Sequence, residues 1–327
     1  ITTPSVNEKV AKVNVRTKVV LPEGADPAKY SVETSVWNPN KQKLTAVRTS
    51  LAQMKYNNNQ AEQEFVIQAP SLWSPEMPAL YSAETRLYEG DKLKDIYTTP
   101  FGIRSIEIIP DKGFFLNGKR TVFKGVCNHH DLGPLGAAVN DAAIRRQIRI
   151  LKDMGCNAIR TSHNMPAPEL IRACDEMGMM IMAESFDEWN VAKCKNGYNL
   201  LFDEWAEKDL VNLLHNFRNN PSVVMWCIGN EVPNQWNEGD CKIAKWLQDI
   251  CHREDPTRPV TQGMDAPDAV VNNNFAAVMD VAGFNYRPFK YKINYKKLPQ
   301  RIVLGSETAS TVSSRGVYKF PVERKAM

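Results

Sequence analysis

Two glutamates each follow a short apolar segment, and this placement points to chemistry. Val223–Ile228 is an almost continuous apolar run, and Glu231 comes three residues after it. Ile302–Leu304 is a second apolar run, and Glu307 comes three residues after it. Such runs are typical of strands buried on both faces, and in βα folds ligands bind where the parallel strands end. A pair of carboxylates about 5 to 5.5 Å apart at that place suits hydrolysis of a glycosidic bond with retention.

An isolated glutamate more commonly lies in a surface loop. The matching design of the two segments favours a shared site instead. If Glu231 and Glu307 face one mouth, burial and the neighbouring negative charge raise the pKa of the carboxyl that acts as the acid. That acid then serves as the base in the second half of the reaction.

The elements that must position these glutamates begin after Gly102, where strand and helix patterns alternate. Asn117-Gly118 is typical of a hairpin turn, and Gly155 and Gly178 each end an amphipathic helical pattern. We expect helices at residues 141–154, 168–177, 201–217 and 241–251. We expect strands at residues 121–128, 156–161, 179–183, 223–228, 259–262, 278–286 and 302–304. Seven strands of this kind predict a (β/α)8 TIM barrel that lacks its last βα unit.

The preceding part of the chain has a different pattern. From Lys9 to about Arg104, short alternating runs are separated by Pro, Gly and Asn clusters. This spacing predicts an antiparallel β-sandwich of immunoglobulin type, without the paired cysteines of antibody domains. We therefore expect an immunoglobulin-like β-sandwich at residues 1–104 and a catalytic TIM barrel at residues 105–327, incomplete at its C-terminal end.

Composition narrows the class of protein. A hydrophobic share of 43% and a charged share of 24% are ordinary for a globular protein. The net charge of +4 comes without a basic stripe, so no nucleic-acid partner is expected. No apolar run approaches the roughly 20 residues of a membrane helix, so no membrane partner is expected. Seven cysteines without a CxxC pair argue against a zinc site or a disulfide framework, and the compartment stays open: periplasmic or secreted, or cytoplasmic.

Seven short motifs follow one another along the chain, each where a barrel strand is expected. Their order resembles that of glycoside hydrolase family 2 and, within it, of the β-galactosidases. The resemblance covers the chain from about Leu72 to about Ser310. It is carried by FLNGK (115–119), GVCNHHD (125–131), NAIRTSHN (157–164), AESFDEW (183–189), IGNE (228–231), GFNY (283–286) and GSETAS (305–310).

The resemblance implies a role for four of these residues. Glu231 would be the general acid/base and Glu307 the nucleophile. Asn230 resembles the asparagine that hydrogen-bonds the 2-hydroxyl of the sugar, although an asparagine here could simply form a turn. Tyr286 resembles the tyrosine that steadies the nucleophile, although a tyrosine at a strand end commonly packs in the core.

Three further residues follow the expected barrel strands. His163 resembles the histidine that contacts the sugar, and Arg160 would structure the site by forked hydrogen bonds to carboxylates. His130 lies in the same class of position, next to His129. A metal bound by these histidines is an alternative, which the family resemblance also allows as a divalent or monovalent ion. Two-carboxylate catalysis needs no cofactor, so none is expected.

The segment after residue 182 departs from the family pattern. Family members commonly have an Asp-Glu pair where this chain has Ala183-Glu184, so Glu184 alone would orient the site. Asp187 would supply hydrogen bonds, and Trp189 would offer a stacking face to the sugar or else lie in the core. Ser310 stands where some members have a histidine, which leaves the finer sugar contacts open.

Taken together, the motifs predict a retaining exo-β-glycosidase acting on β-linked sugars, with terminal β-D-galactosides as the first choice. A β-glucuronidase or β-mannosidase of the same family is the alternative, and a non-catalytic carbohydrate-binding fragment is another. The chain is expected to be a fragment with weak or no activity by itself. Two open sheet edges would favour association, so a homo-oligomer is also considered.

Overall fold

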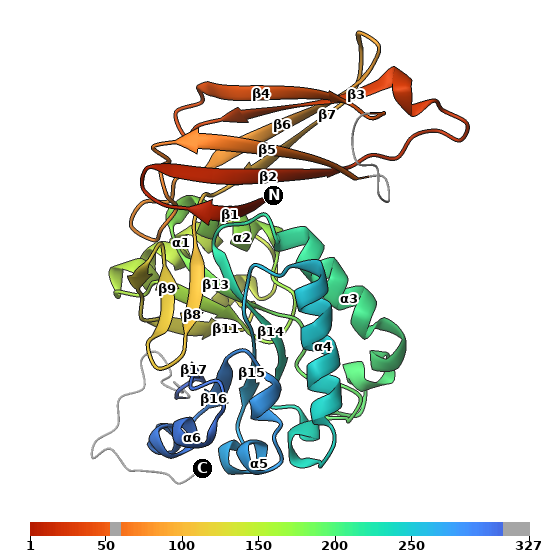
Figure 1. Cartoon of the computed structure of the whole chain (residues 1–327). Coiled ribbons are helices and arrows are strands. Elements are labelled where there is room, and N and C mark those ends of the chain that lie inside the picture. Colours follow the sequence, from red (N-terminus) through yellow and green to blue (C-terminus); the bar gives the residue numbers. More distant parts are fainter. Residues whose placement is uncertain (53–59, 310–327) are drawn as a thin grey trace.

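The computed structural model describes residues 1–52 and 60–309. A β-sandwich sits above an α/β part, and the two are packed against each other (Figure 1). Ser310 and the rest of the predicted barrel region up to residue 327 lie outside the described residues.

The sandwich consists of two antiparallel sheets, ordered β1-β2-β5 and β4-β3-β6-β7. Alternation places Val13, Val36 and Phe65 between the sheets, where they are buried. The sequence pattern missed β4 and β7, because exposed residues dominate both strands. The seven strands are Thr2–Val6 (β1), Val10–Lys18 (β2), Tyr30–Trp37 (β3), Lys43–Ser50 (β4), Gln60–Gln68 (β5), Tyr81–Glu89 (β6) and Lys92–Phe101 (β7).

A small antiparallel sheet follows, made of Ile106–Ile109 (β8), Gly113–Leu116 (β9) and Lys119–Arg120 (β10). The predicted Asn117-Gly118 turn joins β9 to β10, with both residues at positive φ. Phe114 and Leu116 of β9 pack in one cluster with residues of three strands of the next sheet. The hairpin therefore supports the large sheet at the end from which its strands begin.

Seven parallel strands form the large sheet in sequence order, β11 to β17, as a curled part of a barrel. The predicted sandwich and the predicted barrel without its last βα unit are thus both confirmed within the described residues. Cys127 of β11 donates from Sγ to the carbonyl of Ser306 in β17 (3.3 Å), so the two outer strands lie close together. The strands are Gly125–Asn128 (β11), Ala158–Thr161 (β12), Met180–Glu184 (β13), Val223–Asn230 (β14), Val260–Met264 (β15), Ala282–Asn285 (β16) and Val303–Glu307 (β17).

Helices cover the outer face of this sheet. They are Asp141–Asp153 (α1), Pro168–Met177 (α2), Phe202–Phe217 (α3), Cys241–Glu254 (α4), Pro267–Asn272 (α5) and Tyr291–Lys297 (α6). The single-turn 3-10 helices are Pro27–Lys29, Gly133–Leu135, Tyr198–Leu200, Pro233–Trp236, Ala276–Val278 and Pro288–Lys290. The predicted strand at 278–286 is shorter than expected, because the chain makes one of these turns before β16 begins.

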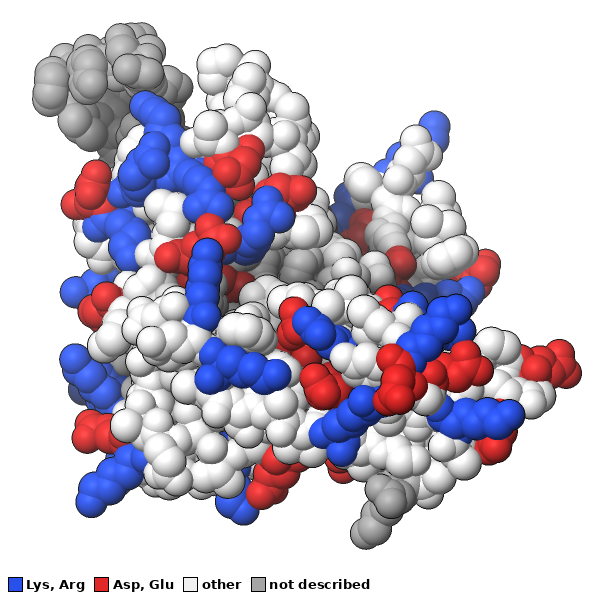
Figure 2. All heavy atoms as spheres, turned by 90° about the horizontal axis from the view of Figure 1, so that it is seen from above, with Lys and Arg blue, Asp and Glu red and all other residues white. Residues whose placement is uncertain are grey.

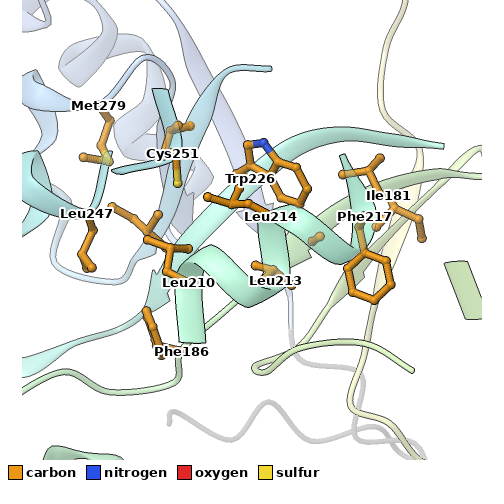
Figure 3. Packing of buried hydrophobic residues seen from close by; sticks show 14 of the residues in the cluster. Ile181, Phe186, Leu210, Leu213, Leu214, Phe217, Trp226, Leu247, Cys251 and Met279 are labelled. Atoms are coloured by element: carbon orange, nitrogen blue, oxygen red, sulfur yellow. The ribbon is translucent and has the colours of Figure 1, made fainter. Parts of the chain in front are cut away.

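The four long helices match the sequence prediction to within a few residues because each has a clear apolar stripe. Gly178 ends α2 in the left-handed conformation, as its position suggested. Figure 3 shows the stripe of α3, with Leu210, Leu214 and Phe217, facing Trp226 of β14. All eight residues of β14 are buried, which is what the apolar run before Glu231 indicated.

The sandwich is joined to the large sheet by buried polar contacts. The side chain of Arg104 donates to the carbonyls of Pro221 (2.7 Å) and Val223 (2.8 Å), and burial lowers the pKa of Arg104 to about 9. Trp73 donates from Nε1 to the carbonyl of Asp175 in α2 (2.9 Å). These contacts hold the sheet at its lower edge and leave the other edge free for a site.

Surface and sulfur chemistry give no competing function. Figure 2 shows basic and acidic side chains interspersed over the face seen from above. None of the helices in residues 1–52 and 60–309 combines the length and apolar character that crossing a bilayer requires. The seven cysteines are free thiols, as the sequence predicted.

Candidate active site

The predicted carboxylates meet where the strands of the large sheet end. Glu231 directly follows β14, and Glu307 is the last residue of β17. Between them lies Asn285, the last residue of β16, whose Nδ2 is 2.9 Å from Glu231 Oε1 and 3.2 Å from Glu307 Oε2. These two distances place the carboxylate oxygens no more than 6.1 Å apart. Glu231 and Tyr286 both have positive φ, 43° and 54°, a strained conformation often found at functional sites.

Three side chains hold the Glu307 carboxylate. Tyr286 donates its hydroxyl to Oε1 (2.7 Å), while Arg160 Nη1 (2.9 Å) and Asn285 Nδ2 (3.2 Å) donate to Oε2. The carboxylate therefore has a defined orientation, with donors on both oxygens. This is the contact that the resemblance implied for Tyr286.

The environment of Glu231 differs. Burial raises the pKa of this half-buried carboxyl, and the negative charges of Asp265 and Glu307 raise it further, against opposing contributions from Asn285 and Lys193. A raised pKa favours the protonated form. Glu231 is thus suited to donate a proton, whereas Glu307 is held as an acceptor.

Arg160 ties the nucleophile candidate to a second, fully buried carboxylate. Its guanidinium donates to Glu184 Oε1 (2.7 Å), to Glu307 Oε2 (2.9 Å) and to Asn230 Oδ1 (2.9 Å). Glu184 is completely buried and also accepts from His163 Nδ1 (3.0 Å). The forked hydrogen bonds expected of Arg160 and the orienting position expected of Glu184 are both present in this geometry.

Asn230 lies at the centre of the polar group, almost completely buried. Its Oδ1 accepts from Arg160 and from Asn285 Nδ2 (3.0 Å), and its Nδ2 donates to Asp187 Oδ1 (3.0 Å). Asp187 also accepts from Lys193 Nζ (2.8 Å). Burial alone would raise the pKa of Asp187, but the hydrogen bonds from Lys193 and Asn230 outweigh it and lower the pKa.

The three histidines separate in the structure. His163 has its Nε2 4.0 Å from Glu307 Oε2, so it lies at the site. His129 meets its ring edge to face, with centroids 4.8 Å apart. His130, which the sequence placed in the site, instead contacts the carbonyl of Ala137 (3.2 Å) in its own loop. The reason is local: His130 has a positive φ, which turns consecutive histidines to different sides.

These side chains make a poor metal site. One ligand atom each of His129, His163 and Glu307 lies within 4.8 Å of the others. However, both Glu307 oxygens already accept hydrogen bonds, and the positive charge of Arg160 faces one of them. A cation at this point would meet repulsion and few free lone pairs.

Trp189 corrects one expectation. Its side chain is fully buried, its ring stacks on Phe275 (5.8 Å between centroids) and its Nε1 donates to the carbonyl of Ile228 (2.9 Å). It is therefore a core residue under β14 and offers no face to a sugar. The alternative position in the core, noted from the sequence, is the one the structure has.

Two residues of the site were missed by sequence reasoning. Asn285 and Ser306 are both buried, and Ser306 Oγ donates to Asn285 Oδ1 (2.8 Å). Asn285 was within reach of prediction, because it precedes Tyr286 at the end of an apolar segment, as Asn230 precedes Glu231. Ser306 follows a glycine in a strand and carries no such sign.

A cavity of about 430 Å³ adjoins the polar group, and His163, Asp187, Phe186 and Tyr198 are among its lining residues. Its volume is within the range of ligand pockets, about 300 to 1,000 Å³. A buried donor network, one carboxyl with raised pKa, one anchored carboxylate and an adjoining cavity can together transfer a proton and perform a nucleophilic displacement.

Comparison with known proteins agrees with this geometry. The family model for glycosyl hydrolases family 2, TIM barrel domain, matches residues 107–323. The model described as glycosyl hydrolases family 2 matches residues 1–104.

Individual relatives point the same way. The chain is 36% identical to β-galactosidase BoGH2A of Bacteroides ovatus, over 99% of this chain and 42% of that protein. It is 33% identical to a putative β-glucuronidase of Formosa agariphila, over 98% of this chain and 28% of that protein. A β-glycosidase structure from Bacteroides vulgatus is similar with a TM-score of 0.83 at 34% identity, covering 97% of this chain and 39% of that one. The chain thus spans less than half the length of these relatives.

Proposed function

This chain belongs to glycoside hydrolase family 2, and we propose that it supplies the catalytic centre of a retaining exo-β-glycosidase that hydrolyses terminal β-D-galactosides. Glu307 would be the nucleophile and Glu231 the general acid/base. The chain covers only part of its relatives' length, so the proposal concerns the protein that contains it.

The observation that carries the proposal is the spacing of the two carboxylates. Their nearest bonded oxygens lie at most 6.1 Å apart, because Asn285 bridges them with hydrogen bonds of 2.9 and 3.2 Å. Retaining glycosidases separate their carboxyl groups by about 5 to 5.5 Å, whereas inverting enzymes need about 6.5 to 9.5 Å to admit a water. The geometry therefore supports retention.

The reaction follows from the two environments. The Glu307 carboxylate attacks the anomeric carbon while Glu231 gives its proton to the leaving oxygen, which forms a glycosyl ester and leaves Glu231 ionised. Glu231 then takes a proton from water, and the resulting hydroxide attacks the same carbon and releases Glu307 as a carboxylate. Asn230 has one Nδ2 hydrogen that no protein acceptor uses among the described hydrogen bonds, and it would donate that hydrogen to the sugar.

Charge favours a neutral sugar over a uronate. The two cations that contact the carboxylates of the site, Arg160 and Lys193, are ion-paired with Glu184, Glu307 and Asp187. A substrate carboxylate would have to compete with these protein carboxylates for either cation. The alternative, a β-glucuronidase, is kept because relatives at similar identity carry that name.

Hydrolysis of chromogenic β-galactoside and β-glucuronide by the full-length protein, side by side, tests the proposal. Cleavage of the galactoside, lost in Glu231→Gln and Glu307→Gln, is expected. Azide should rescue Glu231→Gln as a β-glycosyl azide and Glu307→Gln should stay inactive toward the same substrate, since only Glu307 is a nucleophile.

Preference for the glucuronide would overturn the substrate and keep the mechanism. Inversion at the anomeric carbon, followed by NMR of the first product formed, would overturn the assignment of Glu307. Cleavage of neither substrate, with folded protein, would favour β-mannosides or a non-catalytic carbohydrate-binding role.

A further inference from the structure

One amide contacts both candidate catalytic carboxylates. Asn285 Nδ2 lies 2.9 Å from Glu231 Oε1 and 3.2 Å from Glu307 Oε2, and 3.0 Å from Asn230 Oδ1. The Asn285 side chain is completely buried, so water does not compete for these acceptors. No other side chain in residues 1–52 and 60–309 is hydrogen-bonded to both glutamates.

The orientation of this amide follows from its surroundings. Ser306 Oγ donates to Asn285 Oδ1 at 2.8 Å, and Ser306 is itself buried. The reversed amide would turn Oδ1 towards three oxygens, two of them carboxylate, with no donor between them. That arrangement is strongly unfavourable, so Ser306 and the carboxylates select the same orientation.

Two hydrogens must serve three acceptors. Asn230 Oδ1 has a second donor in Arg160 Nη2 (2.9 Å), which can satisfy it alone. Glu231 Oε1, in contrast, has Asn285 as its only hydrogen-bond donor among the described contacts. The two Nδ2 hydrogens are therefore directed at the two carboxylates, one at each.

We propose that Asn285, anchored by Ser306, is a positioning residue that donates one hydrogen bond to each catalytic carboxylate and so supports both half-reactions. This rests on the proposed function. In the first step Glu307 loses its negative charge to the glycosyl ester while Glu231 gains one by giving up its proton. In the second step the charge returns to Glu307. A fixed amide between the two favours the charge at either end without moving.

The first measurement is kinetic and uses Asn285→Ala in the full-length protein. An aryl β-galactoside with a poor leaving group reports glycosylation through kcat/KM, and a dinitrophenyl β-galactoside reports deglycosylation through kcat. Both should fall on the order of 10²-fold, as for loss of one preorganised donor. Ser306→Ala should lower both by a smaller factor, because the amide remains but loses its anchor.

The second readout is the pH profile of kcat/KM, which a merely structural role would not move. The amide stabilises ionised Glu231, so its removal raises the pKa of Glu231 and shifts the alkaline limb to higher pH. Asn294→Ala is the matched control, since Asn294 in α6 is also completely buried but its amide has no hydrogen-bond partner among the described residues. The alkaline limb should not move in that variant.

An unmoved alkaline limb in Asn285→Ala would overturn the proposal, and so would a loss confined to one half-reaction. A titration of Glu231 by 13C NMR of glutamate-labelled protein, assigned with Glu231→Gln, does not depend on turnover. If the parent protein cleaves no glycoside, the function fails, yet a raised Glu231 pKa in folded Asn285→Ala still supports the positioning contact. An unchanged pKa overturns it.

Discussion

Arg160 offers the most informative perturbation of the buried network. Only 3% of its side chain is exposed, and it lies between the carboxylates of Glu184 (2.7 Å) and Glu307 (2.9 Å). Arg160→Met keeps a long side chain but removes the positive charge. Glu184, with no exposed side-chain surface, then retains only His163 as an ion-pair partner. Breaking a buried pair in this way costs about 3 to 5 kcal/mol of unfolding free energy.

A second substitution separates stability from catalysis. In Arg160→Met/Glu184→Gln the uncompensated buried charge is absent, so most of the lost unfolding free energy should return. Catalysis should not return, because Glu307 Oε2 still lacks its 2.9 Å donor. We expect kcat/KM to stay on the order of 10²- to 10³-fold below the parent in both variants.

Urea unfolding followed by tryptophan fluorescence, together with hydrolysis rates, measures both effects. Arg16→Met is a matched control, since Arg16 pairs with Glu62 at 2.7 Å with both side chains 64% exposed. That change should stay within about 0.5 kcal/mol. A double variant no more stable than Arg160→Met would refute the reasoning, because the cost would then come from lost packing and not from the stranded charge of Glu184.

Two further predictions concern the same sheet. Gly263→Ala should lower kcat/KM on the order of 10²-fold, because its Cβ would lie 2.6 Å from Arg160 Nη2 and displace it. Kinetics beside Gly90→Ala, whose Cβ meets nothing within 4 Å, check this, and parental activity in Gly263→Ala would contradict it. Burial raises the pKa of Asp255, but Arg258 (2.6 Å) outweighs it and the pKa is lowered. Asp255 therefore stabilises the fold above its unfolded pKa of about 3.9, and this stability is lost as pH falls through the lowered folded pKa, so Asp255→Asn should flatten the acid limb of the urea midpoint against pH. An acid limb as steep as the parent's would count against that role.

Local pattern was enough to predict the elements that position the site. An apolar run buried on both faces identified β14, and a glycine in the left-handed conformation ended α2 as expected. The rule that ligands bind at the ends of parallel strands then selected Glu231 and Glu307 together, although 76 residues separate them. These predictions succeed because each depends on sequence neighbours or on the general geometry of βα folds.

Predictions of side-chain direction fared less well. Trp189 ends in the core because the strand-end loop turns it under β14, and His130 turns away while His129 meets His163. The direction of a side chain in a loop depends on φ and on distant partners, which no local period encodes. Asn285 was missed for a related reason, since its importance comes from acceptors on two other strand ends.

The contacts also explain why single residues of this site resist separate assignment. Arg160 and Asn285 both donate to Asn230 Oδ1 and to Glu307 Oε2, so each partly replaces the other when one is removed. Side chains that share acceptors in this way have coupled, non-additive effects. Glu231 is the exception, because its carboxylate has Asn285 but not Arg160 as a donor. The pKa of the acid should therefore respond to Asn285 far more than to Arg160, although both residues hold the nucleophile.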